Sequence, residues 1–233
     1  MSARIAIVDH GAGNLVSIEG ALRRVGADVV VATDAAALAG ADGVVMPGVG
    51  TAGPAMERLG RHGLVQPLRA WLAADRPYLG ICLGLQLLFD ASDEDGAATL
   101  GAISGRTVGL EGAPTVPHIG WNQVELARPH PLFSGIADGV DQYFVHSFAG
   151  APTDPSVVLA HTTHGRRFVS AVARGRVLGV QSHPEMSGAD GLRLLANFVA
   201  LVDSGWTPDR SPVTGPSPVV GRHRAASRAG SVS

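Results

Sequence analysis

Residues 78–89 read YLGICLGLQLLF, and they hold Cys82, the only cysteine of the chain. An apolar run with β-forming residues ends at this cysteine, and a stretch with helix-forming residues follows it. Gly80 and Gly84 flank it, although glycine inside a strand or helix costs stability. Gly-x-Cys-x-Gly between a strand and a helix is the pattern of a nucleophile elbow, with cysteine in the place of serine. A buried structural cysteine is the alternative, and the pentapeptide by itself leaves both open.

The elbow lies among segments that alternate between strand and helix. Short apolar runs predict strands at 4–8, 27–33, 42–48 and 76–81. Helical patterns are found at 15–26, at 54–74 with interruptions at Gly63 and Pro67, and at 83–92. Continuous apolar strands that alternate with helices are typical of a parallel sheet covered on both faces.

From about Leu100 the pattern changes to short strands and turns. The expected strands lie at 107–112, 116–127, 142–150, 156–164 and 168–184, and a last amphipathic helix lies at 190–205. We therefore expect an α/β protein whose central sheet is mainly parallel, with a more antiparallel C-terminal half.

Composition agrees with one sizeable domain. Of the 233 residues 45% are hydrophobic and 16% are charged, which is enough apolar material for a substantial core. The net charge of −2 shows no basic excess that would favour nucleic acid as a partner. All 18 basic residues are arginine, so lysine has no catalytic role.

The chain shows no targeting pattern. Asp9 interrupts the short apolar stretch at the N-terminus, which therefore does not resemble a signal peptide. No stretch is long enough and free of charge to span a membrane, and a single cysteine suits the cytosol. We expect a cytoplasmic protein with one domain over 1–206, followed at 207–233 by a disordered tail rich in Pro, Ser and Arg.

A nucleophilic cysteine needs a base and a group that orients the base. His183 follows the apolar run 177–180, and Glu185 lies two residues later. In an extended segment residues i and i+2 project to the same side, so this carboxylate can hold the imidazole. A surface His-Pro turn is the alternative for these residues taken alone. The amide of Leu83, at the start of the helix after Cys82, points where an oxyanion would form.

Residues 44–53, VVMPGVGTAG, form a third candidate element. An apolar strand runs into the loop 47–50, whose glycines can present backbone N–H groups to an oxyanion and permit a peptide flip. A plain turn between a strand and a helix is the alternative. A phosphate-binding loop is disfavoured, because the Walker lysine and the GxGxxG pattern are both absent.

PGVG, GICLGLQLLF and GVQSHPE together resemble the motifs of the class I, triad-type glutamine amidotransferases. Within that family, VPHIGWN (116–122) and YFVHSF (143–148) are similar to the glutaminase subunits of imidazole glycerol phosphate synthases. The resemblance covers residues 4 to about 203, in the family's order. It implies a three-layer, flavodoxin-like fold of the class I glutamine amidotransferase type.

The resemblance implies a role for each matching residue. Cys82 attacks the side-chain amide of glutamine, His183 acts as base and then as acid, and Glu185 orients His183. The amide of Leu83 and an amide of the Val49–Gly50 peptide hold the oxyanion. No cofactor or metal is implied. The positions that match the glutamine-binding residues of the family are Gly50, Gln86, Ser147 and Phe148.

A partner is implied as well. In the family, ammonia passes through a channel to a (βα)8-barrel cyclase, which converts the intermediate PRFAR to imidazole glycerol phosphate and AICAR in histidine biosynthesis. We expect a heterodimer with such a cyclase. Trp121, Asn122 and Tyr143 match partner-facing positions, although a place for Trp121 in the core is the alternative. His118 and His146 lack metal-ligand spacing and are expected to be structural or to line the channel.

Four positions depart from the family pattern, and none belongs to the triad. Ser182 and His10 stand where aromatic residues are usual, Met186 where a basic residue is common, and Phe148 where Tyr is common. Three other functions share part of the pattern. Glutaminase subunits for anthranilate or GMP synthesis are not expected to carry VPHIGWN or YFVHSF. A cysteine peptidase or chaperone on the same fold usually has His directly after Cys, and a silent regulatory binding module would not need an intact triad.

Overall fold

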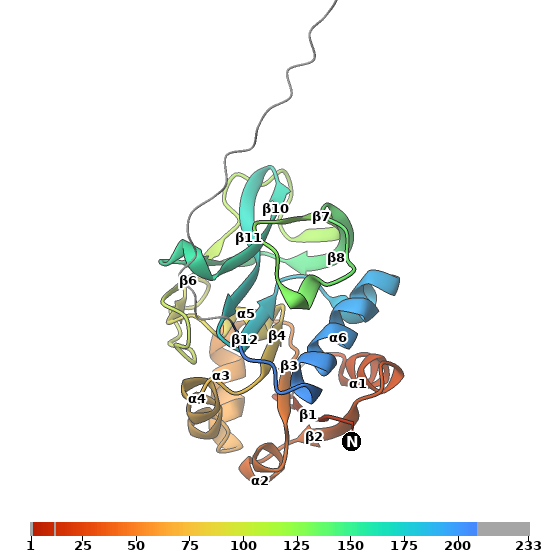
Figure 1. Cartoon of the computed structure of the whole chain (residues 1–233). Coiled ribbons are helices and arrows are strands. Elements are labelled where there is room, and N and C mark those ends of the chain that lie inside the picture. The colour runs from red at the N-terminus through yellow and green to blue at the C-terminus, as the bar shows by residue number, and fades with distance from the viewer. Residues whose placement is uncertain (1, 12, 209–233) are drawn as a thin grey trace, which may run out of the picture.

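A computed structural model gives the fold of residues 2–11 and 13–208. It is a central sheet with helices on both faces (Figure 1). The helices are α1 (Leu15–Arg24), α2 (Ala35–Ala39), α3 (Ala52–Arg61), α4 (Val65–Ala73), α5 (Leu83–Gln86) and α6 (Gly188–Asp203), with 3-10 turns at Pro131–Phe133, Pro155–Val157 and Pro184–Met186. From position 209 onward the predicted tail lies outside the described residues.

Twelve strands make up the sheet. They are β1 (Arg4–Val8), β2 (Asp28–Ala32), β3 (Gly43–Met46), β4 (Tyr78–Ile81), β5 (Ala91–Ser92), β6 (Gly105–Gly109), β7 (His118–Leu126), β8 (Val140–His146), β9 (Phe148–Pro152), β10 (Val158–His164), β11 (Arg166–Arg174) and β12 (Val177–Val180). The main order is β2-β1-β3-β4-β12-β11-β10-β7-β8, and β9, β6 and β5 branch from β11.

Strand direction divides the sheet into two halves. The strands from β2 to β12 are parallel, and β11, β10, β7 and β8 continue the sheet with antiparallel pairs. This arrangement confirms the predicted fold class. The parallel half follows from strand–helix alternation, whereas the short connections from β10 to β11 and from β11 to β12 allow only antiparallel neighbours.

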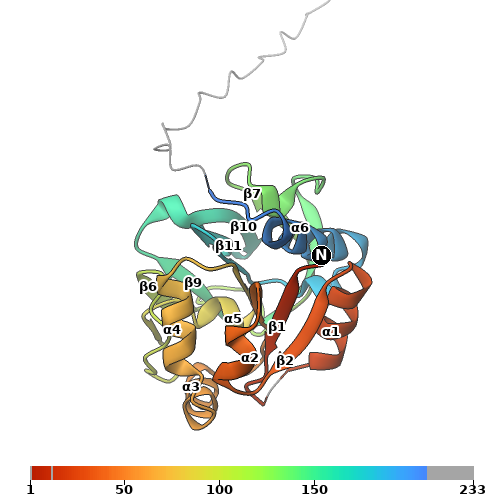
Figure 2. The same ribbon diagram turned by 60° about the horizontal axis from the view of Figure 1, so that its bottom comes forward.

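Alternate residues of the parallel strands enter two separate cores. Ile5 and Ile7 of β1 belong to the core that α1 and α6 cover, whereas Ala6 and Val8 belong to the core under α2, α3, α4 and α5. The division follows from the strand period of two, which sends successive side chains to opposite faces. Figure 2 shows the two helix layers on either side of β1 and β2. The result is the expected three-layer arrangement.

Several predicted elements differ in extent from those observed. The helical stretch predicted at 54–74 is interrupted at Gly63 as expected, because the chain turns there with φ +66°. The interruption expected at Pro67 is wrong, because Pro67 lies in the first turn of α4, where proline is tolerated. The helix predicted at 83–92 ends at Gln86, and the chain then pairs β5 with β6. The strand predicted at 142–150 is divided at Ser147 into β8 and β9.

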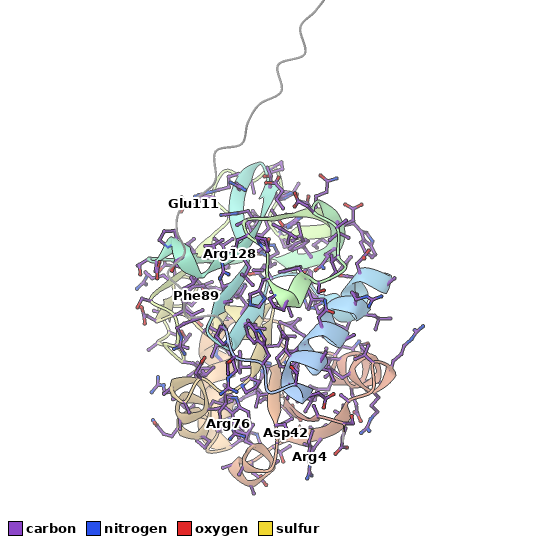
Figure 3. All side chains as sticks on the ribbon, viewed as in Figure 1. Arg4, Asp42, Arg76, Phe89, Glu111 and Arg128 are labelled. Atoms are coloured by element: carbon purple, nitrogen blue, oxygen red, sulfur yellow. The ribbon has the colours of Figure 1, made fainter. Side chains whose placement is uncertain are left out.

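Charged residues mark the amino ends of the parallel strands. The backbone N–H of Arg4 donates to the Asp42 carboxylate at 2.9 Å. The guanidinium of Arg76 donates to the carbonyl of Ala41 at 2.7 Å and lies 3.3 Å from the ring centroid of Trp71. Figure 3 shows Arg4, Asp42 and Arg76 together at the lower end of the molecule. The carboxyl ends of the same strands therefore lie at the opposite edge.

The elbow after β4 depends on glycines that allow backbone segments to meet. A Cβ on Gly84 would lie 1.8 Å from the carbonyl oxygen of Met46, and one on Gly80 would lie 2.3 Å from that of Gly84. The hydroxyl of Tyr78 donates to the same Gly84 carbonyl at 3.0 Å. Only glycine fits at these two positions, which explains their place around Cys82.

Among the described residues no helix is long and apolar enough to cross a membrane.

Two glycine substitutions should have opposite effects on stability. Gly84→Ala should lower the free energy of unfolding by about 3 kcal/mol or more, because the Met46 carbonyl belongs to a strand that cannot easily move. Gly20→Ala should raise it by about 0.5–1 kcal/mol, because Gly20 lies inside α1 with open space around it. Urea unfolding of both variants measures the difference. Equal stabilities of Gly84→Ala and the parent would contradict the packing described.

Candidate active site

Cys82 lies on the elbow between β4 and α5, at the carboxyl edge of the parallel strands. Its backbone has φ +52° and ψ −106°, and among the described non-glycine residues only Asp75 also has a positive φ. Side chains rarely adopt such a conformation, and it persists only where the surroundings hold it. The backbone N–H of Cys82 donates to the carbonyl of Val180 at 2.8 Å. This strained turn places the side chain of Cys82 in the lining of a cavity.

His183 and Glu185 follow β12, the strand beside β4. The Nδ1 atom of His183 and Oε1 of Glu185 are 2.8 Å apart, and each side chain is only 6% exposed. The second nitrogen of the imidazole, Nε2, is buried and faces the sulfur of Cys82. One ring nitrogen is therefore held by a carboxylate while the other remains available.

The backbone of His183 is fixed by β8 and by Ser187. Its N–H donates to the carbonyl of Tyr143 at 2.8 Å. The Ser187 hydroxyl donates to the carbonyl of His183 at 2.6 Å and accepts from the N–H of Tyr143 at 3.0 Å. These bonds hold the imidazole in a defined position relative to the sheet.

The charges around His183 favour its protonated form. Burial alone would lower the pKa of this imidazole, but hydrogen bonds and charges from Cys82 and Glu185 outweigh burial and raise the pKa to about 10. In contrast, burial lowers the pKa of His118 and of His146 to about 4. His183 is thus an imidazolium at neutral pH, whereas the two other histidines are neutral.

A cavity of about 230 Å³ opens next to Cys82. Two sides of it come from the loop after β3 and from the end of β8. The four residues predicted to hold glutamine are all brought together here. The lining consists of Val49, Gly50, Cys82, Gln86, Glu94, Pro117, Val145, His146, Ser147 and Phe148.

The loop at 47–50 directs the carbonyl of Gly48 towards the elbow. The N–H of Leu83 donates to the carbonyl oxygen of Gly48 at 3.3 Å. This carbonyl and the N–H of Val49 belong to the same peptide unit, so the N–H faces away from Leu83. Gly50 has φ +92°, a conformation that glycine adopts without strain. The donor predicted at Leu83 is therefore occupied in this structure.

The departures from the family pattern have local explanations. His10 Nε2 lies 2.9 Å from the carbonyl of Pro47 and 2.5 Å from the position of a Cβ on Gly48. This histidine therefore packs directly against the loop at 47–50. Burial lowers the pKa of His10. Ser182 is buried and donates to the side chain of Gln142. Met186 is 48% exposed.

Glu94 is a lining residue that the sequence reasoning missed. It stands in the acidic run 93–95, and nothing in such a run distinguishes a cavity residue from a solvated turn. Burial and then the charge of Asp95 raise the pKa of Glu94, against a hydrogen bond from Thr51 that lowers it. A carboxylate in this position favours a positively charged group in the cavity.

The two histidines of the antiparallel half form a hydrogen-bonded pair. His146 lines the cavity, and its Nε2 lies 3.1 Å from Nδ1 of His118. The amide nitrogen of Asn122 lies 3.1 Å from the other ring nitrogen of His118. Within residues 2–11 and 13–208 no group of three or more His, Cys, Asp or Glu side chains is arranged to hold a metal ion.

The residues predicted to face a partner lie on β7 and β8. Trp121 is 58% exposed, so the alternative that placed it in the core is wrong. Its ring meets that of Tyr143 edge to face, with centroids 6.0 Å apart. Asn122 is half-buried and is already bonded to the carbonyl of Thr163 at 3.0 Å. Ile119, on the same side of β7 as Trp121, is also exposed.

Comparison with known proteins places this site in a family. A family model described as "Glutamine amidotransferase class-I" matches residues 6–202. The chain is 50% identical over 201 residues to "Imidazole glycerol phosphate synthase subunit HisH" of Symbiobacterium thermophilum, covering 86% of this chain and 95% of that protein. It is 48% identical over 209 residues to the protein of the same name from Halobacterium salinarum, covering 84% and 93%.

A solved structure shows the same fold at lower identity. A "glutamine amidotransferase" crystal structure aligns with a TM-score of 0.69 and 18% identity, covering 85% of this chain and 98% of that one. The family model spans the Cys82 elbow, the loop at 47–50 and the segment of His183. This chain therefore belongs to the class I glutamine amidotransferase family.

Proposed function

We propose that this chain is the glutaminase subunit of an imidazole glycerol phosphate synthase, which hydrolyses glutamine to glutamate and ammonia. The observation that carries the proposal is a cysteine on a strained elbow that lines a small cavity and interacts with a buried His–Glu pair. Relatives named as HisH subunits, at up to 50% identity across most of the chain, support this choice within the family.

The reaction would begin at Cys82. The sulfur attacks the side-chain amide carbon of glutamine and forms a C–S bond, and the carbonyl oxygen becomes an oxyanion. When the C–N bond breaks, the imidazolium of His183 gives its Nε2 proton to the departing nitrogen, which leaves as ammonia. The neutral imidazole then takes a proton from water, which attacks the thioester and releases glutamate. Glu185 keeps the ring orientation through both steps.

The oxyanion would need a change in the loop at 47–50. The Gly48 carbonyl now accepts from the Leu83 amide, and a carbonyl repels an oxyanion. Rotation of the Gly48–Val49 peptide would replace that carbonyl with the N–H of Val49, so that Leu83 and Val49 could both donate. This rotation changes ψ of Gly48 and φ of Val49, and glycine at position 48 leaves its ψ less restricted than any other residue would. We infer that the loop has two states, one with the Gly48 carbonyl towards Leu83 and one with the Val49 N–H in its place. Binding of substrate to the partner would favour the second state.

The cavity offers complementary groups for the rest of the glutamine molecule. Gln86, Ser147 and Phe148 present polar atoms beside Cys82, and Glu94 presents a carboxylate. The α-ammonium group of glutamine is the positive charge that would satisfy Glu94. No cofactor is needed for these steps, since every proton is moved by His183 or water.

Ammonia would be used by a cyclase subunit in a heterodimer. We infer that this partner is a (βα)8 barrel that converts PRFAR to imidazole glycerol phosphate and AICAR. It would cover the exposed Trp121 on β7, because large aromatic residues are enriched at interfaces. Tyr143, which contacts the Trp121 ring, binds the backbone of His183, so the interface and the triad are adjacent.

The direct test is glutamate release by the full chain, alone and with its cognate cyclase and PRFAR. Release should be low for the chain alone and rise about tenfold or more in the complex. Cys82→Ala should abolish it, and added ammonium salt should still support the cyclase paired with Cys82→Ala. Trp121→Ala should weaken the complex without lowering the stability of the chain. High release that is insensitive to the cyclase would indicate another amidotransferase or a hydrolase.

Glu94→Gln should separate substrate binding from chemistry. The KM for glutamine should rise about ten- to a hundredfold, since a hydrogen bond to a charged group is lost, while kcat changes little. Because the pKa of Glu94 is raised, the KM of the parent should also increase as the pH falls, starting above the usual range of carboxylates. The control is Asp93→Asn, which removes a neighbouring charge that pairs with Arg106 outside the cavity. An unchanged KM in Glu94→Gln would contradict this role.

A further inference from the structure

Gln181 is a buried polar residue that none of the steps above uses. It is the first residue after β12, its exposure is 0%, and its backbone N–H donates to the carbonyl of Ser170 at 2.8 Å. Its side-chain nitrogen Nε2 lies 3.5 Å from the sulfur of Cys82. A buried amide in contact with a reactive sulfur calls for an explanation beyond packing.

The neighbours of Gln181 determine which end of its amide faces the sulfur. The amide nitrogen of Gln86 donates to the carbonyl of Phe148 at 2.8 Å and to Oε1 of Gln181 at 3.2 Å. A backbone carbonyl can only accept, so the NH2 group of Gln86 must face Phe148. Its second N–H then requires the oxygen of Gln181. The NH2 group of Gln181 is therefore left to face Cys82.

The other neighbour of the Cys82 sulfur is a hydrogen-bond acceptor, whereas the Gln181 amide is a donor. The carbonyl oxygen of Val145 lies 3.8 Å from Sγ of Cys82, at a distance where it accepts from a thiol. An anionic sulfur cannot donate to that carbonyl and needs N–H donors instead. Because Cys82 is only 4% exposed, water contributes little to this need. The described side chains that can donate to the sulfur are those of His183 and Gln181.

We propose that Gln181 is a catalytic residue whose side-chain amide donates to the sulfur of Cys82 and stabilises its negative charge. This role rests on the proposed function and adds to it. During attack the sulfur supplies an electron pair to the amide carbon. During thioester hydrolysis the C–S bond breaks and that pair returns to the sulfur, while His183 holds the proton taken from water. The N–H of Gln181 stabilises the anion before the first step and after the second.

The chain of amides also links the sulfur to the substrate cavity. Gln86 and Phe148 line the cavity, and Gln181 is bonded to Gln86. When glutamine displaces or strengthens the bond between Gln86 and Phe148, the orientation of the Gln181 amide is affected directly. Gln181 therefore connects the substrate cavity to the sulfur of Cys82 through hydrogen bonds.

Alkylation of Cys82 by iodoacetamide at neutral pH tests this role without any glutaminase assay. Since Cys82 is the only cysteine, every adduct reports on this sulfur. In the full chain, Gln181→Leu and Gln181→Met remove the donor but keep a similar volume. Both should be alkylated about ten- to a hundredfold more slowly than the parent, because a hydrogen bond to a charged group is lost. A purely structural role predicts the opposite, since a loosened site would expose the sulfur and speed alkylation.

Gln142→Leu is the matched control. Gln142 is also a buried glutamine near the triad, but it bonds to Ser182 and not to the sulfur. Its alkylation rate should stay within about twofold of the parent value. In the complex with the cyclase, Gln181→Leu and Gln181→Met should lower kcat for glutamate release more than they raise KM. Alkylation at or above the parent rate in a folded Gln181 variant would overturn the proposal. A parent that alkylates as expected but releases no glutamate would instead count against the glutaminase function.

Discussion

The contact between Gly84 and the carbonyl of Met46 is the constraint on which the rest of the site depends. The 1.8 Å left for a side chain at Gly84 means that the end of β3 and the start of α5 touch through backbone alone. This contact fixes the direction in which the chain leaves β4, and Cys82 takes the positive φ that the turn requires. The same approach brings the loop at 47–50 to the amide of Leu83. Cys82 and the amide of Leu83, the proposed nucleophile and oxyanion donor, are thus positioned by one packing contact.

Burial lowers the pKa of each histidine around the cavity, but the groups next to each histidine differ. His118 and His146 are close to each other and to His164, with no carboxylate in contact, and burial keeps them neutral at physiological pH. His183 is also buried, but its interactions with Cys82 and Glu185 outweigh burial and favour the imidazolium. These two neighbours therefore distinguish His183, the proposed proton donor, from the other buried histidines.

Much of the fold and the placement of Cys82, His183 and Glu185 near one another could be predicted from the sequence, because each rests on local patterns. The strand period, the glycines around Cys82 and the two-residue spacing of His183 and Glu185 all depend on neighbours in the chain. The missed features depend on distant contacts. Glu94 enters the cavity only because β5 pairs with β6, and Gln181 reaches the sulfur only because β12 lies beside β4. The hydrogen bond between Leu83 and Gly48 is equally invisible in the sequence, since it joins two turns of different strands.

The most direct measurement is the site of covalent labelling by a glutamine-like diazoketone, whose diazo carbon takes a proton and then forms a bond to an enzymatic nucleophile as the C–N bond breaks and N2 leaves. The complex with the cyclase would be labelled, digested and mapped by mass spectrometry, with excess glutamine as a competitor. If Cys82 is the nucleophile of a glutamine cavity, one label per chain should appear in the peptide that holds Cys82, and glutamine should suppress it. Labelling at another residue, or labelling of Cys82 that glutamine does not suppress, would contradict a glutaminase built on this elbow.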